Sequence, residues 1–328
     1  MVSITVDSSI PVKFQFRRLS DPSSTLPNSI IGEDYLRYYS DGTPESAWGD
    51  GYMQHFTKWK CNTARLAFAF ADAPVSGDGT HCHSMYDEDK MDRVIEIFDS
   101  YDIKVILDNH NWGDHAKYVG STAWVNNWKA IATHYKGDSR IAGFNIFNEP
   151  GKATWATSGP LGSIDTKEEF IQVCGYLMYQ IRAIDPTRTI YFPCCYGMGI
   201  GLNDPYTLNN LLISYGILDK GNIVIDIGHP YYFEGAYDLG AGYSPEQFAI
   251  KFENEIIIPS VELYGSENCW IGETYAGRSP PYTYDLQVRW LKSFINACLR
   301  HNVGLQVWAF FGKIGLQEAA MTESNYMS

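Results

Sequence analysis

Residues 104–111 read KVILDNHN and residues 141–150 read IAGFNIFNEP, and these two stretches decide the fold. Each begins with a short apolar run rich in strand-forming residues, which is typical of a buried strand. Each then changes to polar side chains at 108–111 and at 148–149. Because the carboxyl ends of parallel strands meet at one end of a sheet, the pattern predicts two parallel strands that present polar groups side by side.

The same alternation of short apolar runs with amphipathic stretches continues along the chain. It predicts further strands at 62–70, 189–192, 222–227, 270–272 and 305–310, and we expect the first strand at Val12–Arg18. Helices are predicted at 122–135, 166–185 and 284–301, after Asp87, after Ser244, and finally at Leu316–Tyr326. Eight strand–helix units predict an α/β fold, a (β/α)8 TIM barrel in one domain over residues 1–328, with an N-terminal extension or loop region at about 1–45.

Local sequence marks where several helices begin. Asp87 precedes apolar residues at helical spacing, namely Met91, Val94, Ile95 and Phe98. Thr166 and Glu169 form the pattern of a capping box, and Ser244 is followed by Pro245, which suits the first helical position. Trp124 and Trp128 lie four residues apart on a predicted helix, and we expect both to belong to the core.

Composition excludes several classes of partner. The net charge is -13, from 38 acidic and 25 basic residues, which argues against nucleic acid because phosphate binding needs Lys and Arg. No run approaches the roughly 18 apolar residues of a membrane span, so we expect no membrane association, and we expect a monomer. Aromatic residues make up 15%, with 9 Trp and 23 Tyr, a content that suits ligands that stack on rings.

Seven cysteines are present without a C-x-x-C pair, which disfavours a structural zinc site. Cys61 and Cys82 are close enough in sequence to bridge a loop, and whether they do is left open. His81-Cys82-His83 supplies too few ligands at suitable spacing for a metal site.

Candidate chemistry lies at the ends of the predicted strands. Glu149 and Glu273 each follow a strand, so a barrel places two carboxylates at one mouth. Two facing carboxylates, one protonated and one ionised, are what glycoside hydrolysis with retention requires. Further polar or aromatic residues in strands or at their ends are Arg65, His110, Asn148, His229, Tyr231 and Trp308.

These residues, in this order, resemble glycoside hydrolase family 5. They stand in N-x-x-R (Arg65), L-D-N-H-N (His110), F-N-E-P (Asn148 and Glu149), H-P-Y (His229 and Tyr231), I-G-E (Glu273) and the last strand (Trp308). The resemblance covers roughly residues 55–312. It departs from the family at His110-Asn111, where His-His is frequent, and after Glu273, where Thr274-Tyr275 follows.

The resemblance implies a role for each position. Glu149 is the acid/base and Glu273 the nucleophile, Arg65 and Tyr231 hold Glu273, and Asn148 binds the sugar 2-hydroxyl. His110 and His229 shape the subsite of the cleaved sugar, and Trp308 is its stacking floor. From their predicted loops, Trp112 and Trp155 are candidate sugar platforms. No cofactor and no metal are implied.

The resulting expectation is an endo-acting retaining β-1,4-glycanase, foremost an endo-β-1,4-glucanase (cellulase), acting on a β-linked polysaccharide or oligosaccharide. We expect it to be secreted, with its signal peptide missing from this sequence, because polymer substrates stay outside cells. Three alternatives remain: an endo-β-1,4-mannanase, a non-catalytic carbohydrate-binding barrel, and a metal-dependent hydrolase using His110, Asp114 and His115.

Overall fold

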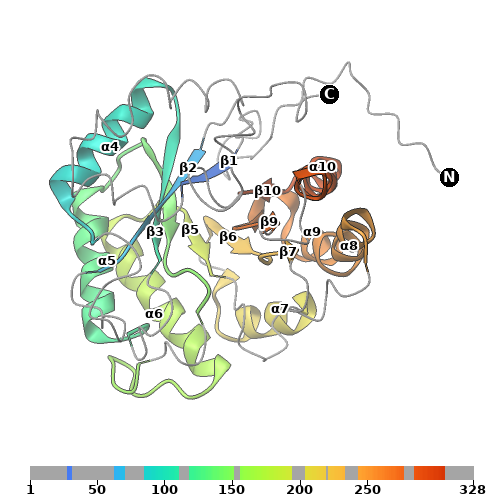
Figure 1. Ribbon diagram of the computed structural model, residues 1–328. Coiled ribbons are helices and arrows are strands. Elements are labelled where there is room, and N and C mark those ends of the chain that lie inside the picture. The colour runs from blue at the N-terminus through green and yellow to red at the C-terminus, as the bar shows by residue number, and fades with distance from the viewer. Residues whose placement is uncertain are drawn as a thin grey trace, which may run out of the picture.

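The computed structural model describes residues 28–31, 63–70, 85–110, 118–150, 156–193, 204–218, 221–232, 243–276 and 284–306. Eight parallel strands form one sheet in the order β1-β2-β3-β4-β5-β6-β8-β10. They are Asn28–Ile31, Thr63–Phe68, Lys104–Asn109, Ile141–Asn145, Ile190–Phe192, Ile223–Asp226, Cys269–Ile271 and Gly304–Leu305. The two ends of the sheet, β1 and β10, contact each other. The molecule is a (β/α)8 barrel with its helices around the sheet (Figure 1).

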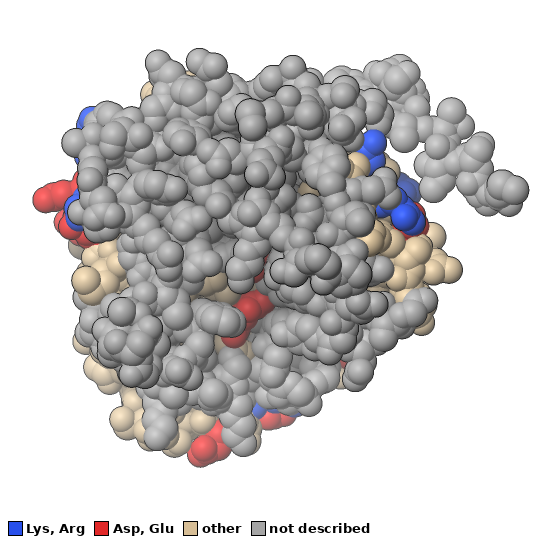
Figure 2. All heavy atoms as spheres, viewed as in Figure 1, with Lys and Arg blue, Asp and Glu red and all other residues tan. Residues whose placement is uncertain are grey.

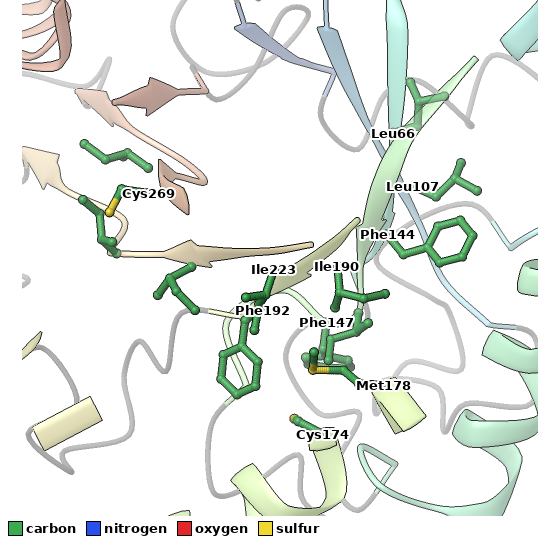
Figure 3. Close-up of a cluster of buried hydrophobic side chains, with 14 of the residues drawn as sticks. Leu66, Leu107, Phe144, Phe147, Cys174, Met178, Ile190, Phe192, Ile223 and Cys269 are labelled. Carbon is green, nitrogen blue, oxygen red and sulfur yellow. The ribbon is translucent and has the colours of Figure 1, made fainter. Parts of the chain in front are cut away.

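Side chains alternate between the two faces of the sheet, as the two-residue repeat of a strand requires, except in β4, where the register with β3 shifts between Val105 and Ile106. Leu66, Leu107, Phe144 and Ile190 point out from the strands toward the helices, and Cys174 and Met178 of the surrounding helices belong to the same cluster (Figure 3). The inward positions hold a second, smaller set inside the barrel: Ile106, Tyr191, Val224 and Trp270. Polar residues share these inward positions at Arg65, Asp108, Asn145, Asp226 and Gln306, all buried.

The predicted helices that fall within the described residues are confirmed, and three of their caps are as expected. Helix α4 (Glu88–Ser100) begins at Asp87, whose side chain accepts from Lys90 N, and it buries Met91, Val94, Ile95 and Phe98. Helix α6 (Lys167–Ile184) has the Thr166/Glu169 capping box, and α8 (Pro245–Phe252) begins at Ser244. Helices α5 and α10 span Thr122–His134 and Tyr284–His301. In α5, Trp124 and Trp128 are fully buried.

Two features of the outer layer were not predicted. Helix α7 (Pro205–Ser214) begins at Asp204, whose carboxylate accepts from the amides of residues 206 and 207. Between α8 and α9 (Ile258–Tyr264), the helix widens into a π-helical turn at Glu253–Ile257. The Glu253 carboxylate binds Arg300 and His301 of α10, so this turn is fastened to the last helix.

The first strand is a correction. Val12–Arg18 lies outside the described residues, and the strand that pairs with β2 is β1, with Asn28 opposite Thr63 and Ile31 opposite Leu66. This strand falls within the N-terminal extension or loop region that we expected at about residues 1–45. Four apolar or small residues, NSII, carry too little periodicity to be recognised without their partner.

Several predictions lie outside the described residues and stay predictions. They concern Trp112, Trp155, Trp308, Cys61, Cys82, the 81–83 triplet and the 316–326 helix. Of the helices that the structure describes, none combines the length and the apolar character needed to cross a membrane.

The core predicts one clear stability effect. Trp128 packs against Phe68, Phe70 and Phe144, and its indole N–H donates to the Ile146 carbonyl at 2.9 Å. Trp128→Ala should therefore lower the free energy of unfolding by about 3–5 kcal/mol, measured by urea denaturation followed by circular dichroism. The control Ile213→Ala, on an exposed residue of α7, should change it by less than about 0.5 kcal/mol. Equal effects of the two changes would contradict this description of the core.

Candidate active site

Arg65 lies at the centre of the site, inside the barrel and fully buried. Its Nη2 lies 2.5 Å from Asn148 Oδ1 and 3.0 Å from Asp108 Oδ2. Its Nη1 donates to the Gly272 carbonyl at 3.3 Å and to Glu273 Oε2 at 3.4 Å. One guanidinium thus connects β2 with the ends of β3, β4 and β8. Because Arg keeps its proton in proteins, it supplies a permanent positive charge to two carboxylates.

His110 and Asn148 are oriented by this arginine. His110 Nδ1 lies 2.7 Å from Asp108 Oδ2, and its Nε2 lies 2.9 Å from Asn148 Nδ2. Burial, and next the Arg65 cation, lower the pKa of His110 well below its usual value, so the ring is neutral at pH 7. A neutral ring that donates from Nδ1 to Asp108 has to accept at Nε2. Asn148 therefore donates to His110 and accepts from Arg65, which fixes its amide.

Glu149 is held in an unusual backbone conformation at the mouth of the barrel. Its φ is 42°, in the left-handed region that residues other than glycine seldom adopt. The preceding amide, Asn148 N, donates to the Asn109 carbonyl at 2.9 Å, which ties the segment to β3. Backbone strain of this kind is found preferentially at functional sites. Here it turns the Glu149 carboxylate toward His229, whose Nδ1 lies 2.7 Å from Glu149 Oε1.

His229 is sandwiched between two carboxylates. Its Nδ1 faces Glu149 and its Nε2 lies 2.7 Å from Asp226 Oδ2. Burial by itself would lower the pKa of His229, but the Asp226 and Glu149 carboxylates raise it to about 10. His229 is therefore a buried cation at neutral pH, in contrast to His110.

Glu273 completes the site from the end of β8. An oxygen of Glu273, an oxygen of Glu149 and a ring nitrogen of His229 all lie within 4.8 Å of one another. The side chains of Glu149 and Glu273 are 12% and 6% exposed, so both are largely buried but not completely closed off from solvent. Figure 2 shows acidic side chains near the centre of this face of the molecule. Next to Glu273, Thr274 Oγ1 donates to the Pro230 carbonyl and accepts from Trp290 Nε1.

Six of the ten predicted site residues are thus brought together by the fold. Tyr231 begins the short strand β7 (Tyr231–Tyr232), which pairs with β9 (Tyr275–Ala276), a strand that starts two residues after Glu273. The structure does not describe the Tyr231 side chain, and the three tryptophans lie outside the described residues. The residue that sequence analysis missed is Asp226. Its inward position in β6, two residues after Val224, was the available signal.

Glu149, His229 and Glu273 are the one cluster in the described ranges with suitable atoms for a metal ion. Both ring nitrogens of His229 already face carboxylates at 2.7 Å, so the histidine has no open position for a metal. As folded, His229 is instead hydrogen-bonded to Glu149 on one side and to Asp226 on the other. Asp114 and His115, the other proposed ligands, lie outside the described residues.

Fold and site together define a class: a (β/α)8 barrel whose mouth holds two glutamates beside a buried arginine and two histidines. A family model described as cellulase (glycosyl hydrolase family 5) matches residues 39–215. The chain belongs to glycosyl hydrolase family 5.

Individual relatives are distant. An endoglucanase of Paenibacillus polymyxa is 24% identical over 182 residues, which is 40% of this chain and 46% of that protein, so the match spans less than half of the relative. Among solved structures, Pseudomonas stutzeri endoglucanase Cel5A has a TM-score of 0.60 at 16% identity, covering 92% of this chain and 94% of that one. The cellulose synthase subunit Z (CcsZ) of Clostridioides difficile has a TM-score of 0.57 at 18% identity, covering 88% and 93%. These structural likenesses show a shared fold.

The contacts of Arg65 predict that lysine cannot replace it. An ammonium group lacks the planar fork that reaches Asp108, Asn148 and Glu273 at once. Arg65→Lys should lower the free energy of unfolding by about 3–5 kcal/mol, because it leaves buried charges poorly compensated. The matched control is Arg93→Lys on the exposed face of α4, where the pair with Glu96 contributes little. Urea denaturation of both variants tests this, and a loss no larger for Arg65 than for Arg93 would count against the network.

Proposed function

We propose that this chain is an endo-acting, retaining β-1,4-glycanase, foremost an endo-β-1,4-glucanase. The observation that carries the proposal is the pair of carboxylates at the barrel mouth, with oxygens of Glu149 and Glu273 less than 4.8 Å apart. Retaining glycosidases have carboxyl groups about 5–5.5 Å apart, whereas inverting enzymes need about 6.5–9.5 Å to admit a water. The short separation supports attack by a carboxylate.

In this proposal Glu273 is the nucleophile. Arg65 places a permanent positive charge 3.4 Å from its Oε2, which favours the ionised carboxylate. In the first step a Glu273 oxygen bonds to the anomeric carbon and the glycosidic C–O bond breaks. Asn148, fixed between Arg65 and His110 next to Glu149, is in this proposal the group that holds the sugar 2-hydroxyl.

Glu149 is then the acid/base. It gives its proton to the departing glycosidic oxygen in the first step. In the second step it takes a proton from water, while the water oxygen bonds to the anomeric carbon and the bond to Glu273 breaks. Its hydrogen bond with His229, a group that can itself exchange a proton, suits this alternation between acid and base.

The substrate class rests on relatives. The Paenibacillus polymyxa relative is an endoglucanase, and Pseudomonas stutzeri Cel5A has been solved in complex with cellobiose. A glucan is therefore the first expectation, with a mannan as the alternative that the same catalytic residues would serve. Because such polymers lie outside cells, the proposal includes secretion of the protein, and we propose that it acts as a monomer. Intact carboxylates, with Arg65 and both histidines arranged around them, favour this function over a non-catalytic sugar-binding barrel.

The two carboxylates predict different variant behaviour. Glu149→Gln should lower kcat/KM on polysaccharide by about 10²–10⁴-fold, yet much less on a dinitrophenyl glycoside, whose leaving group needs no proton. Glu273→Gln should lose activity on both, because no covalent intermediate forms. Release of reducing ends and of dinitrophenolate measures this. Glu255→Gln, the same chemical change on an exposed residue paired with Lys251, is the control and should behave as wild type. Identical losses for the two site variants on both substrates would refute the assigned roles.

A panel of polymers tests the substrate. On carboxymethyl-cellulose, mannan and xylan, we expect release of reducing ends to be fastest on the cellulose derivative. The first-formed product, followed by NMR, should be the β-anomer. Activity should be indifferent to EDTA; loss on chelation would instead favour the metal-dependent alternative. No activity on any polymer would leave the fold intact and remove the endo-glycanase proposal.

A further inference from the structure

Asp226 is a buried carboxylate held by three hydrogen bonds. It ends β6, is 3% exposed, and is fixed from two sides. Its Oδ1 accepts from the backbone amides of Gly272 at 3.0 Å and Gly228 at 3.3 Å, and its Oδ2 faces His229 Nε2 at 2.7 Å. Two backbone amides and one imidazole fix the position of the Asp226 carboxylate. Of these partners, only the imidazole can carry a full positive charge to compensate the carboxylate.

The neighbouring strand makes room for this arrangement. A Cβ atom at position 272 would lie 2.2 Å from Asp226 Oδ2 and 2.7 Å from His229 Nε2, so only glycine fits there. The Gly272 carbonyl meanwhile accepts from Arg65 at 3.3 Å. The backbone of Gly272, at the end of β8, therefore lies between two groups of charges. Its carbonyl binds Arg65 and its amide binds Asp226, the partner of His229.

We propose that Asp226 is a positioning residue that keeps His229 protonated on both ring nitrogens and so controls the proton held between His229 and the acid/base Glu149. This rests on the proposed function of Glu149. The three groups form one line, Asp226–His229–Glu149, with both nitrogen–oxygen distances at 2.7 Å. The Asp226 side chain is only 2% exposed, so in this proposal it acts through His229 and does not touch the sugar.

The charges that face His229 set the direction of the effect. Asp226 and Glu149 contact the ring, Glu273 from the end of β8 lies within 4.8 Å of it, and His110 on β3 is electrostatically coupled to it. Beyond Glu273 lies Arg65, which forms ion pairs with both Glu273 and Asp108. His229 and Glu149 share a proton, so their titrations belong to the pair. Removing the negative charge of Asp226 lowers the proton affinity of that pair, whichever member carries the proton.

Asp226→Asn removes the charge with little change of shape. The new amide oxygen can accept from the Gly272 amide, and its NH₂ can donate to Nε2 of a neutral His229. His229 then keeps an Nδ1–H to donate to Glu149. The basic limb of the pH profile of kcat/KM should move to lower pH by about one unit or more, with the melting temperature recorded alongside. In a His229→Asn background the same substitution should leave the limb where it was, because Asp226 acts through His229.

A purely structural role would lower activity or melting temperature without moving the limb, and that result would overturn the proposal. A direct measurement covers the case in which Asp226→Asn fails to fold. In wild-type protein, ring ¹⁵N shifts should show His229 doubly protonated at pH 8; a neutral ring would overturn the proposal as well. This readout needs no turnover. An inactive enzyme with a cationic His229 would therefore sink the proposed function and leave the Asp226–His229 pair standing.

Discussion

The buried guanidinium of Arg65 is the constraint on which the site depends. A permanent charge inside a barrel is tolerated only when it is paired and hydrogen-bonded, because desolvating it is costly. Asp108, Asn148, the Gly272 carbonyl and Glu273 meet that need, and they come from the ends of β3, β4 and β8. The face of Trp270 lies 5.6 Å below the charge. The same contacts that compensate the arginine therefore place Asn148 and Glu273 at the mouth. The contacts that stabilise the buried charge are thus also the contacts that set the geometry of the site.

Two Asp–His pairs lie in this site, and their surroundings leave one histidine neutral and the other positively charged. The negative charge of Asp108 is already compensated by Arg65, so it stabilises a positive charge on His110 less. Burial together with the arginine keeps the His110 ring neutral. Asp226 is held by two backbone amides, without a full positive charge other than His229 among its described contacts. His229 therefore supplies the compensating charge and becomes a cation. The two histidines also contribute to stability in opposite pH ranges. His229, with its raised pKa, stabilises the fold fully below about pH 6.5, and this contribution is lost as the pH rises through about 10. Neutral His110, with its lowered pKa, costs stability as the pH falls below about 6.5.

A structural feature could be predicted from the sequence when the residues that determine it lie close together in the chain. The bounds of α10 and the caps of α4 and α6 were predicted because spacing and capping residues are read within one or two turns. Six site residues were placed because each directly follows, or lies within, a recognisable strand. Strand β1 was missed because four residues have meaning only against β2. Asp226 was missed because its role depends on the absence of a side chain at Gly272, 46 residues further along the chain. The π-helical turn similarly depends on Arg300 and His301 of a later helix.

The partners of the two glutamates explain why they would divide the work. Glu273 is bound to a guanidinium, which does not give up its proton, so its environment favours one state, the ionised nucleophile. Glu149 is bound to an imidazole, a side chain that can give up a proton, and Asp226 behind the ring favours its cationic form. A carboxylate with a fixed partner suits attack on carbon, and one with a titrating partner suits alternate donation and acceptance of a proton. The positive φ of Glu149 is consistent with this division, because a strained turn directs its carboxylate to His229 rather than to the arginine inside the barrel.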